Sequence, residues 1–149
     1  MSAHLFRAML AVAVAVTLAA CSPSADRRSI PPGTDRVVEL TMAEMHFIPN
    51  SLTVKMGETI TFVVTNPNDI PHELFIGNMA DQMAHRAMHL AAPSGGQAAV
   101  SHMGYGTYLP AHGTGMVTYH FATSGEILLG CHLPGHWEAG MKATVSVTP

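Results

Sequence analysis

The stretch that decides the fold is CHLPGHWEAGM, residues 131–141, near the carboxyl end of the chain. It places one thiol, one imidazole and one thioether at intervals of five residues, as Cys131, His136 and Met141. A strand-like apolar run precedes it and a short strand-like run follows it, so we expect a loop that folds back and directs all three donors at one ion. Soft sulfur donors with imidazole suit copper, and two His, one Cys and a weak axial Met form the blue-copper ligand set.

The second imidazole of such a set has one obvious upstream candidate, His72. This residue follows a polar, Pro-containing turn, residues 66–71, and precedes the apolar run of residues 74–76. We therefore expect His72 to open a strand. The candidate metal ligands are His72, Cys131, His136 and Met141.

These four residues resemble the ligands of the cupredoxins, which carry an early His and a late Cys–His–Met loop on a Greek-key β-sandwich. The spacing from Cys131 to His136, with Pro-Gly before the His, is similar to azurin, and the spacing from His136 to Met141 is similar to plastocyanin. The resemblance covers residues 36–147. It implies a type 1 copper, Cu⁺/Cu²⁺, held by the Nδ1 atoms of the two His and by the Cys131 sulfur, with Met141 axial and more distant. Within the family, the His- and Met-rich middle of the chain is most similar to periplasmic cupredoxins linked to copper tolerance.

Other sites could use the same residue types. Structural zinc sites normally have four Cys or His ligands, and a thioether is a poor zinc ligand. A cysteine hydrolase would need a His base beside Cys131, but neighbours on a strand point to opposite faces. We therefore expect the adjacent His132 to point away from the metal, and we expect the protein not to be an enzyme.

Short strand-like runs separated by turn residues predict an all-β fold, a Greek-key β-sandwich with about seven or eight strands. The Gly-rich segment of residues 104–115 is interpreted as an irregular loop. The runs that predict strands are residues 37–42, 44–48, 51–55, 59–66, 72–76, 115–122, 126–131 and 142–147.

One segment breaks the β pattern and predicts a short helix from Met79 to about Leu90, with Asn78 as its cap. At helical spacing, Met79, Met83 and Leu90 share one stripe, which favours packing of this stripe against the sandwich.

A different face of the predicted helix carries Asp81, His85 and His89 at intervals of four residues. Two His at this spacing can chelate a metal ion, and Asp81 could join them or orient one ring. This face is therefore either a solvated polar surface or an accessory metal site.

The amino-terminal residues are typical of an exported lipoprotein. Residues 8–20 form an apolar run that is too short to span a bilayer, where about 20 residues are needed, but suits a signal peptide. The run ends in Leu-Ala-Ala before Cys21, which is similar to the bacterial lipobox and implies removal of residues 1–20 and lipidation of Cys21. Ser22 is similar to a sorting signal for the outer membrane. We expect a flexible tether over residues 21–35 and one cupredoxin domain over residues 36–149.

Charge and cysteine content narrow the functions further. Seven Lys/Arg against ten Asp/Glu give a net charge of −3 without basic clusters, so a nucleic-acid partner has no electrostatic support. With Cys21 lipidated, Cys131 is a lone thiol in an exported protein, and metal ligation would explain it.

Two functions fit these features. The first is a periplasmic carrier that passes single electrons through His136 to a redox partner protein while its lipid keeps it at a membrane. The alternative is a copper-tolerance protein that sequesters or oxidises excess copper with accessory donors, which are Met79, Met83, His85, Met88, His89, His102, Met103, His112 and Met116.

Overall fold

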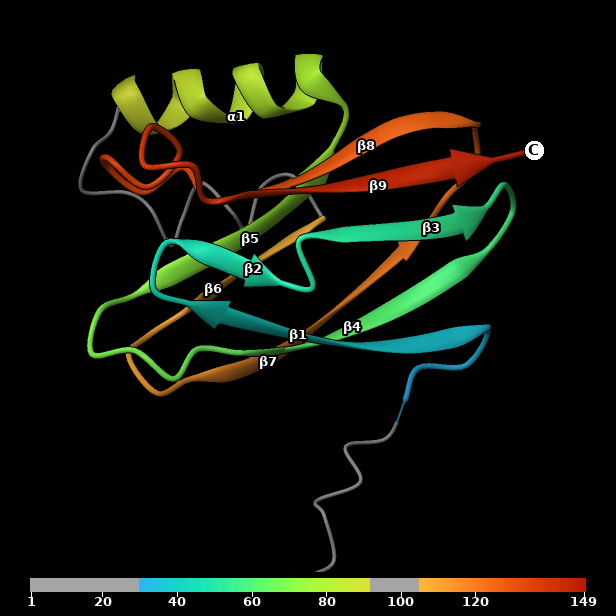
Figure 1. Ribbon diagram of the computed structural model, residues 1–149, viewed down its shortest axis with the longest axis horizontal. Helices are drawn as coiled ribbons and strands as arrows, with labels where there is room; N and C mark the ends of the chain where they lie inside the picture. The colour runs from blue at the N-terminus through green and yellow to red at the C-terminus, as the bar shows by residue number, and fades with distance from the viewer. Residues whose placement is uncertain (1–29, 92–104) are drawn as a thin grey trace, which may run out of the picture.

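The computed structural model describes residues 30–91 and 105–149 of the 149-residue chain (Figure 1). The predicted signal peptide, the lipidation site Cys21 and most of the predicted tether lie outside the described residues, as do His102 and Met103. Within the described ranges, no helix has the length and apolar character needed to cross a membrane.

Two β-sheets face each other and one short helix lies outside them, as predicted. The first sheet has the order β2-β1-β4-β7 and contains β1 (Arg36–Ala43), β2 (His46–Ile48), β4 (Thr59–Thr65) and β7 (Thr114–His120). The second has the order β3-β9-β8-β5-β6 and contains β3 (Ser51–Lys55), β5 (His72–Gly77), β6 (Gly106–Leu109), β8 (Gly125–Gly130) and β9 (Lys142–Thr148). The pairs β1–β4 and β3–β9 are parallel, and the other pairs are antiparallel.

The core lies between the sheets and follows the two-residue period of the strands. In β4, Ile60, Phe62 and Val64 are completely buried, and in β5 the residues Leu74 and Ile76 face them from the second sheet. All six residues of β5 are buried, because a helix covers the other face of this strand. β5 therefore has two distinct buried faces.

That helix is α1 (Met79–Ala91), which lies on the outer face of the second sheet against β5 and β8 (Figure 1). It begins at the predicted cap. Asn78 Oδ1 accepts a hydrogen bond from the Asp81 backbone N–H at 3.0 Å, and Asp81 Oδ2 accepts one from the Asn78 N–H at 3.0 Å. This reciprocal arrangement satisfies two backbone donors at the start of the helix.

The face of α1 that packs against the sheet is not the predicted one. Met79, Met83 and Leu90 are 52%, 40% and 69% exposed, so the predicted packing of this stripe is wrong. The sheet beneath α1 presents the buried Glu73 carboxylate and the carbonyl oxygens of Phe75 and Leu128, which polar side chains can pair with and methionines cannot. The buried residues of the helix are Gln82, His85 and His89.

Two strands also differ from the prediction. β6 forms inside the segment interpreted as an irregular loop and pairs with β5, with Leu109 opposite His72. β2 is shorter than the run predicted over residues 44–48, because Glu44 has a φ of +52°. This left-handed conformation belongs to a turn and cannot continue a strand.

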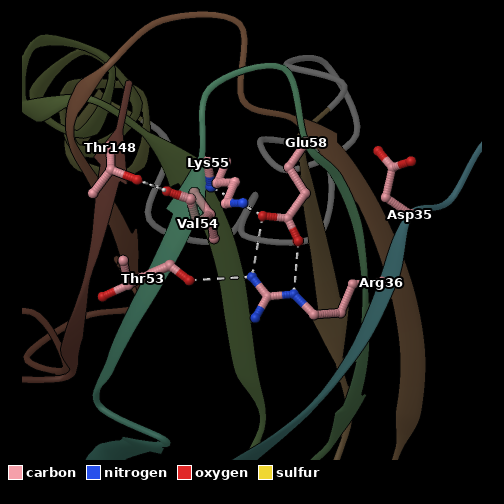
Figure 2. Close-up of a pocket in the computed structure, with 7 residues that line it drawn as sticks. All are labelled: Asp35, Arg36, Thr53, Val54, Lys55, Glu58 and Thr148. Atoms are coloured by element: carbon pink, nitrogen blue, oxygen red, sulfur yellow. Dashed lines mark hydrogen bonds and ion pairs between the residues drawn. The ribbon is translucent and has the colours of Figure 1, made fainter.

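An ion pair lies at the end of the sandwich where β9 ends, far along that strand from Met141 (Figure 2). Arg36 Nε lies 2.8 Å from Glu58 Oε1, and Arg36 Nη2 donates to the Thr53 carbonyl oxygen at 3.2 Å. Glu58 Oε2 accepts a hydrogen bond from the Lys55 N–H at 3.0 Å. These contacts join the start of β1 to the turn between β3 and β4, and such a partly exposed pair adds little stability by itself.

Candidate metal centre

The strand register brings His72 and Cys131 together. β5 and β8 are antiparallel, with Phe75 opposite Gly130, so the first residue of β5 lies beside the residues that follow β8. Cys131 is the first of these residues, and both His72 and Cys131 are completely buried.

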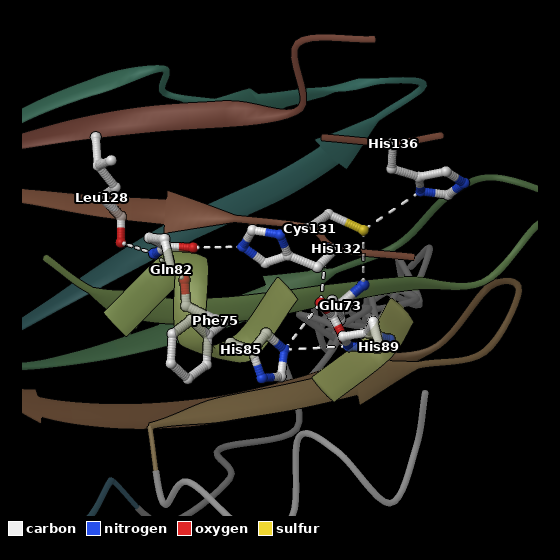
Figure 3. Close-up of polar contacts among 9 residues, drawn as sticks. All are labelled: Glu73, Phe75, Gln82, His85, His89, Leu128, Cys131, His132 and His136. Atoms are coloured by element: carbon white, nitrogen blue, oxygen red, sulfur yellow. Dashed lines mark hydrogen bonds and ion pairs between the residues drawn. The ribbon is translucent and has the colours of Figure 1, made fainter. Parts of the chain in front are cut away.

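His136 completes a group of three metal-binding side chains. The donor atoms of His72, Cys131 and His136 all lie within 4.8 Å of one another. Cys131 Sγ lies 3.3 Å from His136 Nδ1, and the His72 and His136 rings are 4.8 Å apart at 53°. Figure 3 shows the Cys131 sulfur directed at the His136 ring.

The loop of residues 131–141 is held by its own backbone. The His136 N–H donates to the Leu133 carbonyl oxygen at 3.0 Å, which closes a turn around the predicted Pro-Gly pair, with Gly135 at a φ of +85°. The Met141 N–H donates to the His136 carbonyl oxygen at 3.0 Å, and the Met141 carbonyl oxygen accepts from the Cys131 N–H at 3.2 Å. Met141 is thus fixed by its backbone to both Cys131 and His136, and its side chain is completely buried.

Burial keeps the three donors uncharged when no metal is bound. It lowers the pKa of His72 to about 4, with a further contribution from the nearby His136, and it lowers the pKa of His136. Burial raises the pKa of the Cys131 thiol to about 12. Neutral imidazoles have lone pairs free for a metal, whereas the thiol must lose its proton on binding.

The donor set fits copper. Both ring nitrogens of the buried His72 lack a hydrogen-bond partner among the described residues, which is costly for polar atoms removed from water. A ligated ion would satisfy one of them. Two imidazoles and one thiolate are the trigonal part of a blue-copper site. The Cys131 sulfur also accepts a hydrogen bond from the Glu73 N–H at 3.4 Å, which would stabilise a thiolate.

Asn66 fixes the loop that leads to His72. Its buried Nδ2 donates to the carbonyl oxygens of Ile70 at 2.8 Å and Pro110 at 2.9 Å, and its Oδ1 accepts from the Asn68 N–H at 3.0 Å. Asn66 therefore joins the loop before β5 to the loop between β6 and β7. Asp69 instead pairs with His112 at the surface, at 2.9 Å.

His132 points away from Cys131, as expected from strand alternation (Figure 3). Its ring is 4% exposed, stacks on Trp137 with centroids 4.4 Å apart, and places Nε2 2.7 Å from Gln82 Oε1. Burial is the main cause that lowers the pKa of His132 to about 4. His132 therefore connects the loop of residues 131–141 to Gln82 of α1.

The structure brings His85 and His89 together, but not with Asp81. Asp81 is exposed and caps the helix. The third member of the group is Glu73, whose carboxylate lies 3.1 Å from His85 Nε2 and 3.0 Å from His89 Nε2. All three side chains are buried, so the alternative of a solvated polar face is wrong.

Sequence reasoning missed Glu73, although one signal pointed to it. Glu73 is a charged residue at the start of an apolar strand and directly follows a predicted metal ligand. A buried carboxylate requires partners, and the helix that follows β5 supplies two imidazoles. The remaining predicted donors in the described residues are dispersed, with Met79 and Met83 exposed on α1 and His112 on a surface loop.

Comparisons with known proteins agree with this site. Residues 35–148 match the family described as copper binding proteins of the plastocyanin/azurin family. The chain is 35% identical over 114 residues to the copper-resistant cuproprotein CopI of Rubrivivax gelatinosus, which covers 75% of this chain and 66% of that protein. It is 28% identical over 139 residues to the copper-resistant cuproprotein CopI of Pseudomonas aeruginosa, covering 76% and 77%.

Among solved structures, auracyanin B is similar, with a TM-score of 0.61 and 25% identity over 80% of this chain and 94% of that one. The match to the family includes His72 at the start of β5 and the whole loop from Cys131 to Met141. The chain therefore belongs to the plastocyanin/azurin family of copper-binding proteins, the cupredoxins, and the group of His72, Cys131 and His136 is its candidate type 1 copper site.

Proposed function

We propose that this protein serves copper resistance and that its type 1 site, with His72, Cys131 and His136 as ligands and Met141 as a weak axial ligand, exchanges single electrons. The observation that carries the copper chemistry is the convergence of three buried or half-buried donors, one of which has no protein partner for either ring nitrogen. The role in resistance is supported by two relatives named copper-resistant cuproproteins, which match three quarters of the chain. The sequence alone favoured a simple electron carrier, and these relatives reverse that order.

Copper bound at this site would supply a one-electron couple between its +1 and +2 states. The protein keeps the donors in place during such a change, because the two ends of the loop are joined by the hydrogen bonds between Met141 and both Cys131 and His136. Burial of His72 and Cys131 excludes water from the ion. A fixed, dry ligand set reduces the rearrangement that accompanies electron transfer.

His136 is the proposed route for electrons. It is half-buried, whereas His72, Cys131 and Met141 are buried. The adjoining Pro134 and Gly135 are exposed, so a partner could approach the edge of this ring. This feature favours the second candidate function, a carrier that serves a redox partner protein. In both cases we propose binding and electron exchange without turnover of an organic substrate.

We further propose that the protein acts in the periplasm, anchored to the outer membrane by lipid on Cys21. The support is the run ending in Leu-Ala-Ala before Cys21 and the Ser that follows it. An anchor of this kind would keep the copper domain beside the membrane, where cuprous ion and electron-transfer partners are both present.

A deletion strain tests the role. We expect loss of the gene to cause sensitivity to copper with normal respiration, and we expect the wild-type gene to restore growth. Cys131→Ser should fail to restore it, whereas His112→Ala, a change on an exposed loop, should succeed. A respiratory or nitrogen-oxide reduction defect without copper sensitivity would contradict the proposal and favour the electron carrier.

A further inference from the structure

We propose that Glu73, His85 and His89 bind a second metal ion, a divalent transition ion such as Zn²⁺ or Cu²⁺, beneath α1 on the outer face of the second sheet. This site goes beyond the proposed function, because it is separate from the type 1 centre and contains no sulfur. Oxygen and imidazole donors favour divalent ions over Cu⁺, which prefers thiolate and thioether.

The spacing of the donor atoms is that of ligands around one ion. His85 Nε2 lies 3.1 Å from Glu73 Oε1, His89 Nε2 lies 3.0 Å from Glu73 Oε2, and the two Nε2 atoms are 3.2 Å apart. Metal–ligand bonds of about 2.0–2.2 Å place neighbouring ligands roughly 3.0–3.5 Å apart in tetrahedral or octahedral geometry. All three distances lie in this range, with Glu73 offering both of its oxygens to the ion.

Hydrogen bonds alone account poorly for the group. If each Nε2 carries a hydrogen directed at Glu73, the two N–H groups lie side by side with their nitrogen atoms 3.2 Å apart, and neither nitrogen can accept from the other. If only one Nε2 carries a hydrogen, one of the contacts has none. Glu73 Oε2 lies 3.0 Å from His89 Nε2 but has no hydrogen-bond partner among the described residues. A cation at the centre would attract all three lone pairs at once.

The donors are held in place before any ion binds. Glu73 and His85 are completely buried and His89 is 4% exposed. His85 stacks on Phe75 with ring centroids 4.1 Å apart and an angle of 11° between the planes. Neighbouring turns of α1 carry the two imidazoles, and Figure 3 shows the His85 ring directed at Glu73 and His89. Such fixed rotamers reduce the entropy lost on metal binding.

A cavity of about 180 Å³ adjoins one of the three donors. His89 and His132 line it on the protein side, and Arg86 and Glu138, which form an ion pair, line it as well. Three protein ligands leave at least one coordination position for water or another small ligand. Among the three donors, His89 is the one that lines this cavity, so a small ligand would approach the ion past His89.

Glu73 connects this site to the type 1 centre. Its backbone N–H donates to Cys131 Sγ at 3.4 Å, and its Oε1 accepts from the His132 N–H at 2.6 Å. A cation bound by Glu73 would draw negative charge away from Oε1, which accepts the hydrogen bond from the His132 N–H. His132 directly follows Cys131, whose thiolate binds the copper. Occupation of the second site should therefore alter the visible spectrum of copper bound at the first.

Zinc is the probe for the test, because it has no visible absorption and thioethers bind it poorly. The full chain loaded with one copper is dialysed against Zn²⁺, and bound zinc, retained copper and the thiolate–copper absorption are measured together. We expect one tightly bound zinc, full retention of copper and a shift of the absorption band. Glu73→Gln and His89→Gln should each bind zinc at least tenfold more weakly while retaining the copper, and His89→Gln should also keep the band position of the zinc-free wild type. His112→Gln removes an exposed imidazole elsewhere and should bind zinc like the wild type.

Two outcomes would overturn the proposal. One is unchanged zinc binding in both Glu73→Gln and His89→Gln. The other is zinc uptake matched by an equal loss of copper, since zinc would then occupy the type 1 site. His89→Gln covers the case in which Glu73→Gln does not fold, because His89 lies at the cavity and makes no hydrogen bond to the sheet backbone among the described contacts. Its retained thiolate–copper band reports a folded protein.

Discussion

His72 and Glu73 are neighbours in the sequence but face opposite sides of β5. His72 lies against the His136 ring on the copper side, whereas Glu73 lies beneath α1 with His85. Cys131 and His132 divide in the same way, since the Cys131 sulfur faces His136 and the His132 ring stacks on Trp137. Strand alternation thus allows two adjacent residues to serve two different sites.

At the scale of single residues, we expect copper binding to release one proton, from Cys131. Burial raises the pKa of Cys131 to about 12, so the thiol is protonated at neutral pH without metal, and the copper ligand is the thiolate. His72, with a pKa lowered to about 4, and His136, with a lowered pKa, are already neutral there. Copper affinity should therefore rise about tenfold for each pH unit between pH 6 and 8.

Calorimetry in buffers of different ionisation enthalpy would measure this proton directly. A proton count near one supports the assignment of Cys131 as the ligand that is deprotonated. A count near zero would mean either that the thiolate exists before copper arrives or that Cys131 is not a ligand.

At the scale of elements, α1 is attached to the sheet by polar contacts. Gln82 Nε2 donates to the Leu128 carbonyl oxygen at 2.8 Å, and Gln82 Oε1 lies 2.7 Å from His132 Nε2. Gly130 makes this approach possible, because a Cβ atom there would lie 2.5 Å from Gln82 Oε1 and 2.7 Å from a Trp137 ring carbon. The residue before Cys131 must therefore be small.

We expect Gln82→Ala to lower the free energy of unfolding by about 1–3 kcal/mol, because it leaves buried partners without hydrogen bonds. Urea unfolding of the metal-free protein would measure the change. Met83→Ala is the matched control, since Met83 is on the same helix and 40% exposed, and such surface changes usually stay within about 0.5 kcal/mol. Equal effects of the two changes would contradict the polar attachment of α1.

Some strands and helix features could be predicted from the sequence, and others could not. The β-sandwich, the start of α1 and the positions of His72 and Cys131 followed from local periodicity and turn residues. β6 did not, because a four-residue strand depends on pairing with β5 rather than on its own pattern. The buried face of α1 also depends on what lies opposite it. A hydrophobic stripe predicts burial only against an apolar surface, and here the surface contains Glu73.

The candidate sites also combine features that the local sequence predicts with features that depend on contacts between distant elements. Fixed spacing within one loop was enough to relate Cys131 and His136, and the helical period placed His85 beside His89. The carboxylate that joins the two imidazoles lies on a different element, so spacing along the helix suggested Asp81 in its place. Contacts between elements far apart in the sequence require the register of the folded sheet.

At the scale of the whole molecule, the second sheet lies between two groups of side chains that could each hold a metal ion. The type 1 group lies at the end of the sandwich where β5 begins and β8 ends, and the Glu73–His85–His89 group lies under α1 on the outer face. Two hydrogen bonds link them: the Glu73 N–H donates to Cys131 Sγ, and the His132 N–H donates to Glu73 Oε1. Under the two proposals above, the protein would bind copper at the first group and a second divalent ion at the other.

Copper titration with visible absorption and metal counting tests the central claim most directly, applied to the wild type and to Cys131→Ser, with His132→Ala as control. We expect the wild type to develop an intense thiolate-to-copper band that saturates at one equivalent, and Cys131→Ser to lose the band entirely. His132→Ala should keep most of it, because this ring faces α1 rather than the copper. A band that persists in Cys131→Ser, or a wild type that binds copper without one, would contradict the assignment of His72, Cys131 and His136 as a type 1 copper site.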